Sequence, residues 1–145
     1  MIRQVSGSAH FVNLDEIARG LSPLDPTLGR ERAGRVALHQ IKSFIETRCT
    51  FSLETTLAGR THLRTLQDAR SAGFAIRLLL FFVQTPEICL YRIARRIVEG
   101  GHDVPEADVR QRIDRAIGNL PEYTSLTDLW RVMDNTIAAP VTVAE

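Results

Sequence analysis

The segment from Phe74 to Gln84 constrains the fold more than any other part of this 145-residue chain. Its centre, Leu78 to Val83, is an unbroken run of apolar residues. A continuous apolar strand is expected where helices cover both faces of a sheet, as in parallel α/β proteins. The run is far shorter than the roughly 20 residues that cross a membrane. We therefore expect an α/β fold with a mainly parallel sheet.

Strand and helix patterns alternate along the chain, without an internal repeat or a linker. Further short strands are predicted at 10–13, 50–53, 130–133 and 141–144. Helices are predicted from Asp15 onward and at 28–47, 61–72, 86–99 and 103–120, with a short one at 123–129. Thr61 and Thr85 are the expected N-caps of two helices, and Asp103 with Glu106 has the spacing of a capping box. This alternation favours one α/β domain over residues 1–145.

Composition excludes several classes of protein. Eighteen basic and seventeen acidic residues give a net charge of +1, which argues against a nucleic-acid partner even though the cations are mostly arginine. Cys49 and Cys89 lie too far apart in the sequence to indicate a zinc site or a disulfide framework. No signal-peptide pattern opens the chain. We expect a cytoplasmic protein with no membrane partner.

Three carboxylates follow predicted strands: Asp15, Glu54 and Asp134. In a parallel sheet the carboxyl ends of the strands share one edge, where ligands bind. An acid at the end of an apolar strand is typical of a carboxylate beside phosphate-bound magnesium. Taken singly, each of the three is also explained as a helix N-cap or turn residue.

Two predicted helices on either side of Gly100-Gly101 carry arginines. Arg92, Arg95 and Arg96 lie on the first helix, and Arg110, Arg112 and Arg115 lie on the second. Guanidinium groups stabilise the charge of a transferring phosphoryl group, so the pair resembles a lid that closes over an anion. Neighbouring acids balance these charges, and a solvated helical face is the simpler interpretation of the spacing alone.

A series of short motifs resembles the zeta-toxin-like P-loop kinases in order and spacing, over nearly the whole chain. The matching segments are 11–19, 53–61, 95–96, 100–105, 110–112, 119–120 and 130–135. The resemblance implies a three-layer P-loop-kinase-like fold with a helical lid. It also implies an ATP-dependent phosphotransferase with Mg²⁺, which transfers the γ-phosphate to a hydroxyl. Zeta toxins act on the nucleotide sugar UDP-N-acetylglucosamine, and an antitoxin protein is a possible partner.

The resemblance also implies roles for individual residues. Asp15 would be the general base, and the phosphate-facing lid would contain Arg95, Arg96, Arg110 and Arg112. The substrate side of the cleft would contain Asn13, Glu54, Thr55, Thr56 and Arg60, with Glu54 near the magnesium ion. The nucleotide side would contain His102, Asp134 and Asn135.

The sequence departs from this family at one motif. P-loop kinases carry a Gly-rich loop ending in Gly-Lys-Ser or Gly-Lys-Thr, and no such motif occurs here. The only lysine, Lys42, lies inside a predicted helix. We therefore expect an N-terminally truncated kinase domain that is inactive alone. Its sheet should be rearranged or exposed between the strands that end at Glu54 and near Gln84. The alternative is a non-catalytic module that binds a nucleotide sugar or a partner protein.

Overall fold

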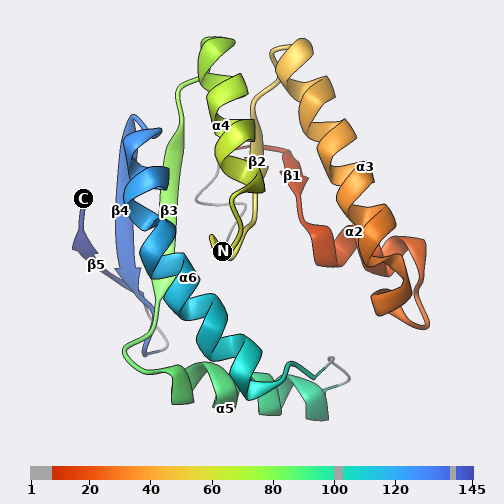
Figure 1. Ribbon diagram of the computed structural model, residues 1–145, viewed down its shortest axis with the longest axis vertical. Coiled ribbons are helices and arrows are strands. Elements are labelled where there is room, and N and C mark those ends of the chain that lie inside the picture. Colours follow the sequence, from red (N-terminus) through yellow and green to blue (C-terminus); the bar gives the residue numbers. More distant parts are fainter. Residues whose placement is uncertain (1–7, 100–102, 138–139) are drawn as a thin grey trace. The chain divides into compact units, whose positions relative to one another are not determined.

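A computed structural model describes residues 8–99, 103–137 and 140–145, which form an α/β fold (Figure 1). In chain order its elements are β1 (His10–Val12), α2 (Leu14–Leu21), α3 (Pro26–Glu46), β2 (Phe51–Leu53), α4 (Thr61–Ser71), β3 (Arg77–Phe82), α5 (Pro86–Val98), α6 (Glu106–Ser125), β4 (Leu129–Asp134) and β5 (Val141–Ala144). Contacts divide the chain into two compact units. The N-terminal unit extends to Thr55 and includes Ser71–Phe74, and the C-terminal unit comprises Thr56–Arg70 and Ala75–Glu145.

The N-terminal unit contains the parallel pair β1 and β2, in which Val12 lies opposite Leu53. Its core is formed by Val12, Ala37 and Ile41, which are almost completely buried. Helix α3 brings two of these residues into the core at helical spacing. It begins with Pro26 after Asp25, whose carboxylate accepts a hydrogen bond from the Thr27 N–H at 3.0 Å. This cap satisfies one of the backbone donors that a helix start leaves free.

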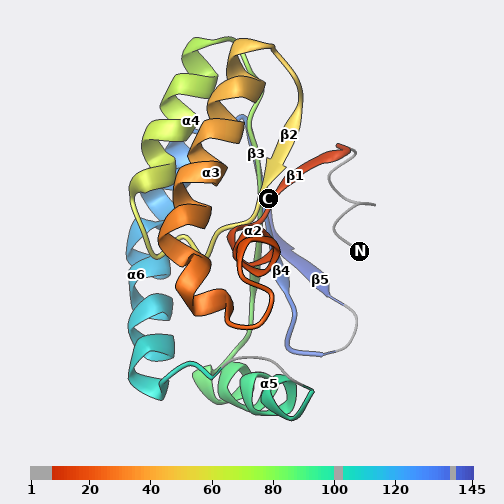
Figure 2. The same ribbon diagram turned by 90° about the vertical axis from the view of Figure 1, so that its right-hand side faces the viewer.

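The C-terminal unit contains a mixed sheet. Strand β3 pairs in parallel with β4 along its whole length, and β5 pairs antiparallel with β4. Helices α4 and α6 lie on the same face of β3 and β4 (Figure 2). The core of this unit is formed by Leu57, Leu63 and Tyr123, against which Leu78 and Leu80 of β3 pack.

The five strands form close to their predicted positions, but they belong to two sheets. Strands β2 and β3 lie in different sheets, and the sheet of the C-terminal unit is mixed instead of mainly parallel. Strand β5 is antiparallel because the six residues between Asp134 and Val141 are too few for a parallel crossover, which needs about a dozen. Within the described residues, no helix combines the length and the apolar character needed to cross a bilayer.

Three predictions about helix ends are wrong. Helix α6 begins at Glu106 after Pro105, so Asp103 does not cap it. The ring of Pro105 disfavours a helical conformation at Val104, which prevents an earlier start. No separate helix forms at 123–129, because α6 continues through Pro121 to Ser125 and buries Tyr123. Thr61 is the first residue of α4 and not its N-cap.

Candidate functional site

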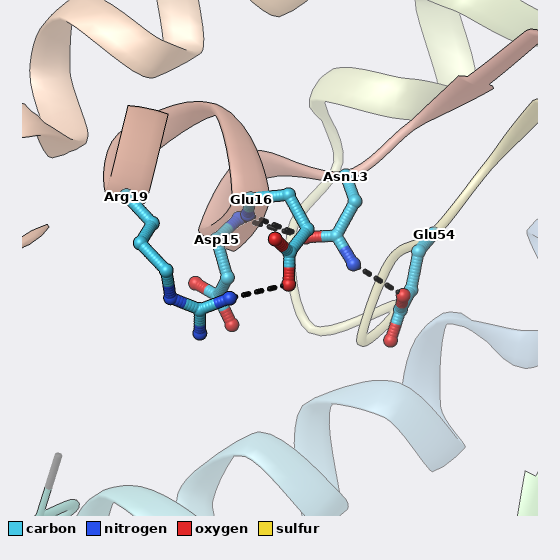
Figure 3. A network of polar contacts seen from close by, with 5 residues as sticks. All are labelled: Asn13, Asp15, Glu16, Arg19 and Glu54. Carbon is cyan, nitrogen blue, oxygen red and sulfur yellow. Dashed lines mark hydrogen bonds and ion pairs between the residues drawn. The ribbon is translucent and has the colours of Figure 1, made fainter. Parts of the chain in front are cut away.

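Asn13 connects the carboxyl ends of β1 and β2 in the N-terminal unit (Figure 3). Its side-chain oxygen accepts hydrogen bonds from the N–H groups of Asp15 at 2.8 Å and Glu16 at 3.1 Å, and so caps α2. Its amide nitrogen donates to Glu54 Oε2 at 2.7 Å. The hydrogen bond between the Asn13 and Glu54 side chains therefore links the ends of two parallel strands. Four of the predicted site residues belong to this unit: Asn13, Asp15, Glu54 and Thr55.

The two acids in the first turn of α2 have different surroundings. The Glu16 carboxylate forms an ion pair with Arg19 at 2.5 Å (Figure 3). The Asp15 carboxylate is exposed and makes no hydrogen bond or ion pair with any residue that the structure describes. A carboxylate with both oxygens available can accept a hydrogen bond, and then a proton, from a hydroxyl group. Asp15 is thus an acid beside the strand ends of this unit that a ligand hydroxyl can reach.

The fit of Glu54 to magnesium depends on other ligands. Over residues 8–99, 103–137 and 140–145, no three His, Cys, Asp or Glu side chains gather into a potential metal site. Magnesium in phosphotransferases is usually held by one or two carboxylates together with phosphate and water oxygens. Glu54 fits as one such carboxylate, with Asn13 fixing one of its oxygens.

Thr56 and Arg60 lie in the loop that precedes α4, within the C-terminal unit. Thr56 is exposed, and its hydroxyl accepts a hydrogen bond from the Ala58 N–H at 3.4 Å. Arg60 forms an ion pair with Glu122 of α6. Two further α6 side chains, Asn119 and Tyr123, contact this loop. Neither residue is predicted to have a role, although Asn119 belongs to one of the family-like motifs.

Arg110 of the predicted lid is engaged by two acids. Its guanidinium group lies 2.9 Å from Glu87 of α5 and 2.8 Å from Glu106 of its own helix. These hydrogen bonds raise the pKa of Arg110, and the bond that it donates to Glu87 has the largest effect. The pKa of Glu87 is lowered, by its own backbone N–H first and by Arg110 second. Arg110 therefore ties α5 to α6 instead of standing free for a phosphate.

The other three lid arginines are exposed. The Arg95 guanidinium group lies 3.6 Å from the Glu99 carboxylate. Because both side chains are solvated, this ion pair contributes little to stability. The side chains of Arg96 and Arg112 make no ion pair or hydrogen bond with the described residues. These two cations remain available for an anionic ligand. His102 and Gly100-Gly101, which the lid prediction includes, lie outside the described residues.

Asp134 ends β4 beside the end of β3, within a small hydrogen-bonded cluster. Its two oxygens accept from the Thr136 N–H at 2.8 Å and from Gln84 Nε2 at 3.2 Å. Hydrogen bonds from the Thr136 hydroxyl and backbone, and then from Gln84, lower the pKa of Asp134. Arg92 reaches the same segment from α5, donating to the carbonyl oxygens of Asn135 at 2.6 Å and Thr136 at 3.2 Å.

An open groove of about 580 Å³ adjoins this cluster. It is lined by Glu87, Ile88, Tyr91, Arg92, Arg95 and Thr136. Tyr91 is two-thirds exposed, so an aromatic face and two arginines border the groove. The sequence predicts Arg92 on the first helix of the lid, four residues from Arg96. Its position against two carbonyls could not be inferred from that spacing, because the partner segment lies more than 40 residues away.

Together these features define an α/β protein with polar side chains at the carboxyl ends of parallel strands in each of its two units. No protein-family model matches the chain, and no solved structure matches it. A protein of Haemophilus influenzae, described as an uncharacterized protein, is 32% identical over 101 residues. The match covers 70% of this chain and 72% of that protein. The chain belongs to the same family as this Haemophilus influenzae protein.

Proposed function

We propose that this chain carries the acceptor side and the nucleotide side of a zeta-toxin-like phosphotransferase. The proposed reaction transfers the γ-phosphate of ATP to a hydroxyl group of a nucleotide sugar such as UDP-N-acetylglucosamine. The proposal includes a P-loop-kinase-like fold for the active protein. It rests on the motif series in the sequence together with the side-chain arrangement in each unit.

The observation that carries this proposal is the bridge from Asn13 to Glu54. Asn13 caps α2 and thereby orients the first turn, where Asp15 presents an unpaired carboxylate among the described residues. In the proposed reaction the oxygen of the acceptor hydroxyl bonds to the γ-phosphorus, and the bond from that phosphorus to ADP breaks. Asp15 accepts the proton that the hydroxyl loses. Glu54 would contribute one ligand to Mg²⁺, which supplies charge neutralisation at the phosphates.

The nucleotide side is proposed to be the groove beside α5. Arg92 fixes the backbone of Asn135 and Thr136 next to Asp134, and Tyr91 and Arg95 offer flat faces to a base. Arg96 and Arg112 would face the phosphates as cations without an acidic partner among the described residues. Arg110 would join them only after releasing Glu87 and Glu106.

The phosphate cradle is the part that the 145 residues do not contain. Lys42 lies within α3, is well exposed and pairs loosely with Glu46 at 3.8 Å, so it does not act as a P-loop lysine. The proposal therefore expects the chain alone to bind its acceptor without transferring phosphate.

The test supplies the missing cradle. A strand, a Gly-rich loop ending in Gly-Lys-Thr and a helix are fused ahead of Ser8, and transfer from ATP to UDP-N-acetylglucosamine is measured. We expect transfer by the fusion and none by the chain alone. Asp15→Asn in the fusion should reduce the rate about 100-fold or more, because a general base contributes roughly 10²–10⁴. Glu16→Gln, in the same helical turn, is the matched control and should retain activity. Equal rates for the two variants would contradict the role of Asp15.

A non-catalytic binding module is the second candidate, and the position of Lys42 within a helix favours it. This alternative also predicts binding of the nucleotide sugar by the chain alone. It differs in the fusion experiment, where it predicts binding of the sugar but no transfer at any ATP concentration.

A further inference from the structure

The loop between Thr56 and Arg60 holds a backbone conformation that is unusual for its sequence. Leu57 has φ of +58°, in the left-handed region that side chains other than glycine rarely adopt. Its side chain is nevertheless 2% exposed and belongs to the core of the C-terminal unit. Such a conformation persists only where the surroundings hold it, and it is often found at ligand-binding segments.

Helix α6 provides the contacts that hold this loop. Asn119 Nδ2 donates to the Leu57 carbonyl at 2.8 Å, and the Tyr123 hydroxyl donates to the Gly59 carbonyl at 2.7 Å. Glu122 forms the ion pair with Arg60. Residues 119, 122 and 123 share one face of α6, since side chains three and four positions apart are neighbours on a helix.

The contacts from Asn119 and Tyr123 use the loop backbone, whereas Glu122 engages the Arg60 guanidinium group, which stays largely exposed. The two carbonyls on either side of Ala58 are occupied by α6, whereas the side chains of Thr56 and Arg60 are exposed. Tyr123 is suited to this role because its ring is buried in the core and its hydroxyl reaches the loop. Burial, with a smaller effect of the Glu122 charge, raises the pKa of Tyr123 above its ordinary value, at which the hydroxyl is already protonated at neutral pH.

We propose that Asn119 and Tyr123 are positioning residues, which hold the 56–60 loop in the shape that presents Thr56 and Arg60 to a ligand. A hydroxyl and a guanidinium group at the two ends of one short loop suit a ligand with hydroxyl and phosphate groups. The identification of that ligand as the nucleotide-sugar acceptor rests on the proposed function. The holding of the loop by α6 rests on the contacts alone.

Trypsin cleavage after Arg60 tests the holding of the loop. Under native conditions this cleavage reports local opening, and cleavage after Arg77 at the start of β3 reports opening of the sheet. The ratio of the two rates is compared among the wild-type chain, Tyr123→Phe, Asn119→Ala and the control Thr124→Val. Thr124 is matched to Tyr123, because its hydroxyl also donates to carbonyls but only within α6.

We expect Tyr123→Phe and Asn119→Ala each to raise the ratio about fivefold, the effect of losing one internal hydrogen bond, and Thr124→Val to leave it within about twofold. Ratios equal to the wild-type value in both loop variants would overturn the proposal.

Ligand binding separates this proposal from the proposed function. We expect the dissociation constant of UDP-N-acetylglucosamine to rise about fivefold in Tyr123→Phe and to stay unchanged in Thr124→Val. A raised cleavage ratio with unchanged affinity would overturn the positioning role. A wild-type chain that does not bind this sugar nucleotide would contradict the proposed acceptor, and the cleavage ratios would still decide whether α6 holds the loop.

Discussion

At the scale of single residues, His62 in the first turn of α4 makes the stability of the chain depend on pH. Its Nδ1 atom is buried and has no hydrogen-bond partner among the described residues. Burial lowers the pKa of this imidazole below its usual value, because the charged form loses hydration. The unfolded chain therefore binds a proton more readily than the folded chain does. The free energy of unfolding therefore keeps its full value above the ordinary histidine pKa of about 6.5 and decreases as the pH falls below it.

We expect the free energy of unfolding, measured with urea between pH 8 and pH 5, to decrease more steeply on acidification for the wild-type chain than for His62→Gln. His39→Gln is the control, since His39 is exposed on α3, and it should keep the wild-type slope. A His62→Gln variant with the same pH dependence as the wild-type chain would show that His62 does not carry the effect.

At the scale of elements, the contact between α2 and α3 depends on Gly29. A Cβ atom at this position would lie 2.8 Å from the backbone oxygen of Ala18, closer than such atoms approach. We expect Gly29→Ala to lower the free energy of unfolding by about 1–3 kcal/mol, because the backbone of one helix must move. Gly34→Ala in the same helix meets no atom within 4 Å and should raise it by about 0.5–1 kcal/mol. Urea denaturation compares the two, and destabilisation by both would contradict the packing explanation.

Element positions follow from the sequence where the signal is local. Asn13 and Asp25, neither of which was predicted as a cap, carry such a local signal, because their side chains reach N–H groups two or three residues ahead. The spacing of Asp103 and Glu106 carries the same kind of signal, but the proline at 105 overrides it. The contacts of Asn119 with Leu57 and of Arg92 with Asn135 span 62 and 43 residues, so no local pattern predicts them.

At the scale of the whole molecule, the sequence predicts the α/β class but not the division into two units. Alternating strands and helices are read from composition and periodicity, whereas the pairing of strands depends on contacts between distant segments. Strand β5 illustrates the difference, because its apolar alternation predicts a strand but not its direction. The predicted site residues are likewise assigned to both units: Asn13, Asp15, Glu54 and Thr55 to one, and the arginines, Thr56, Asp134 and Asn135 to the other.

We propose above all that this chain binds a nucleotide sugar without needing a P-loop. The most direct test is thermal unfolding of the 145-residue chain with and without excess UDP-N-acetylglucosamine. A ligand at about 100 times its dissociation constant adds roughly 2.7 kcal/mol to the native state, which should raise the midpoint by roughly 5–10 °C for a chain of this size. A midpoint that rises with the logarithm of ligand concentration is the predicted result. A midpoint that does not move at millimolar ligand would contradict the claim.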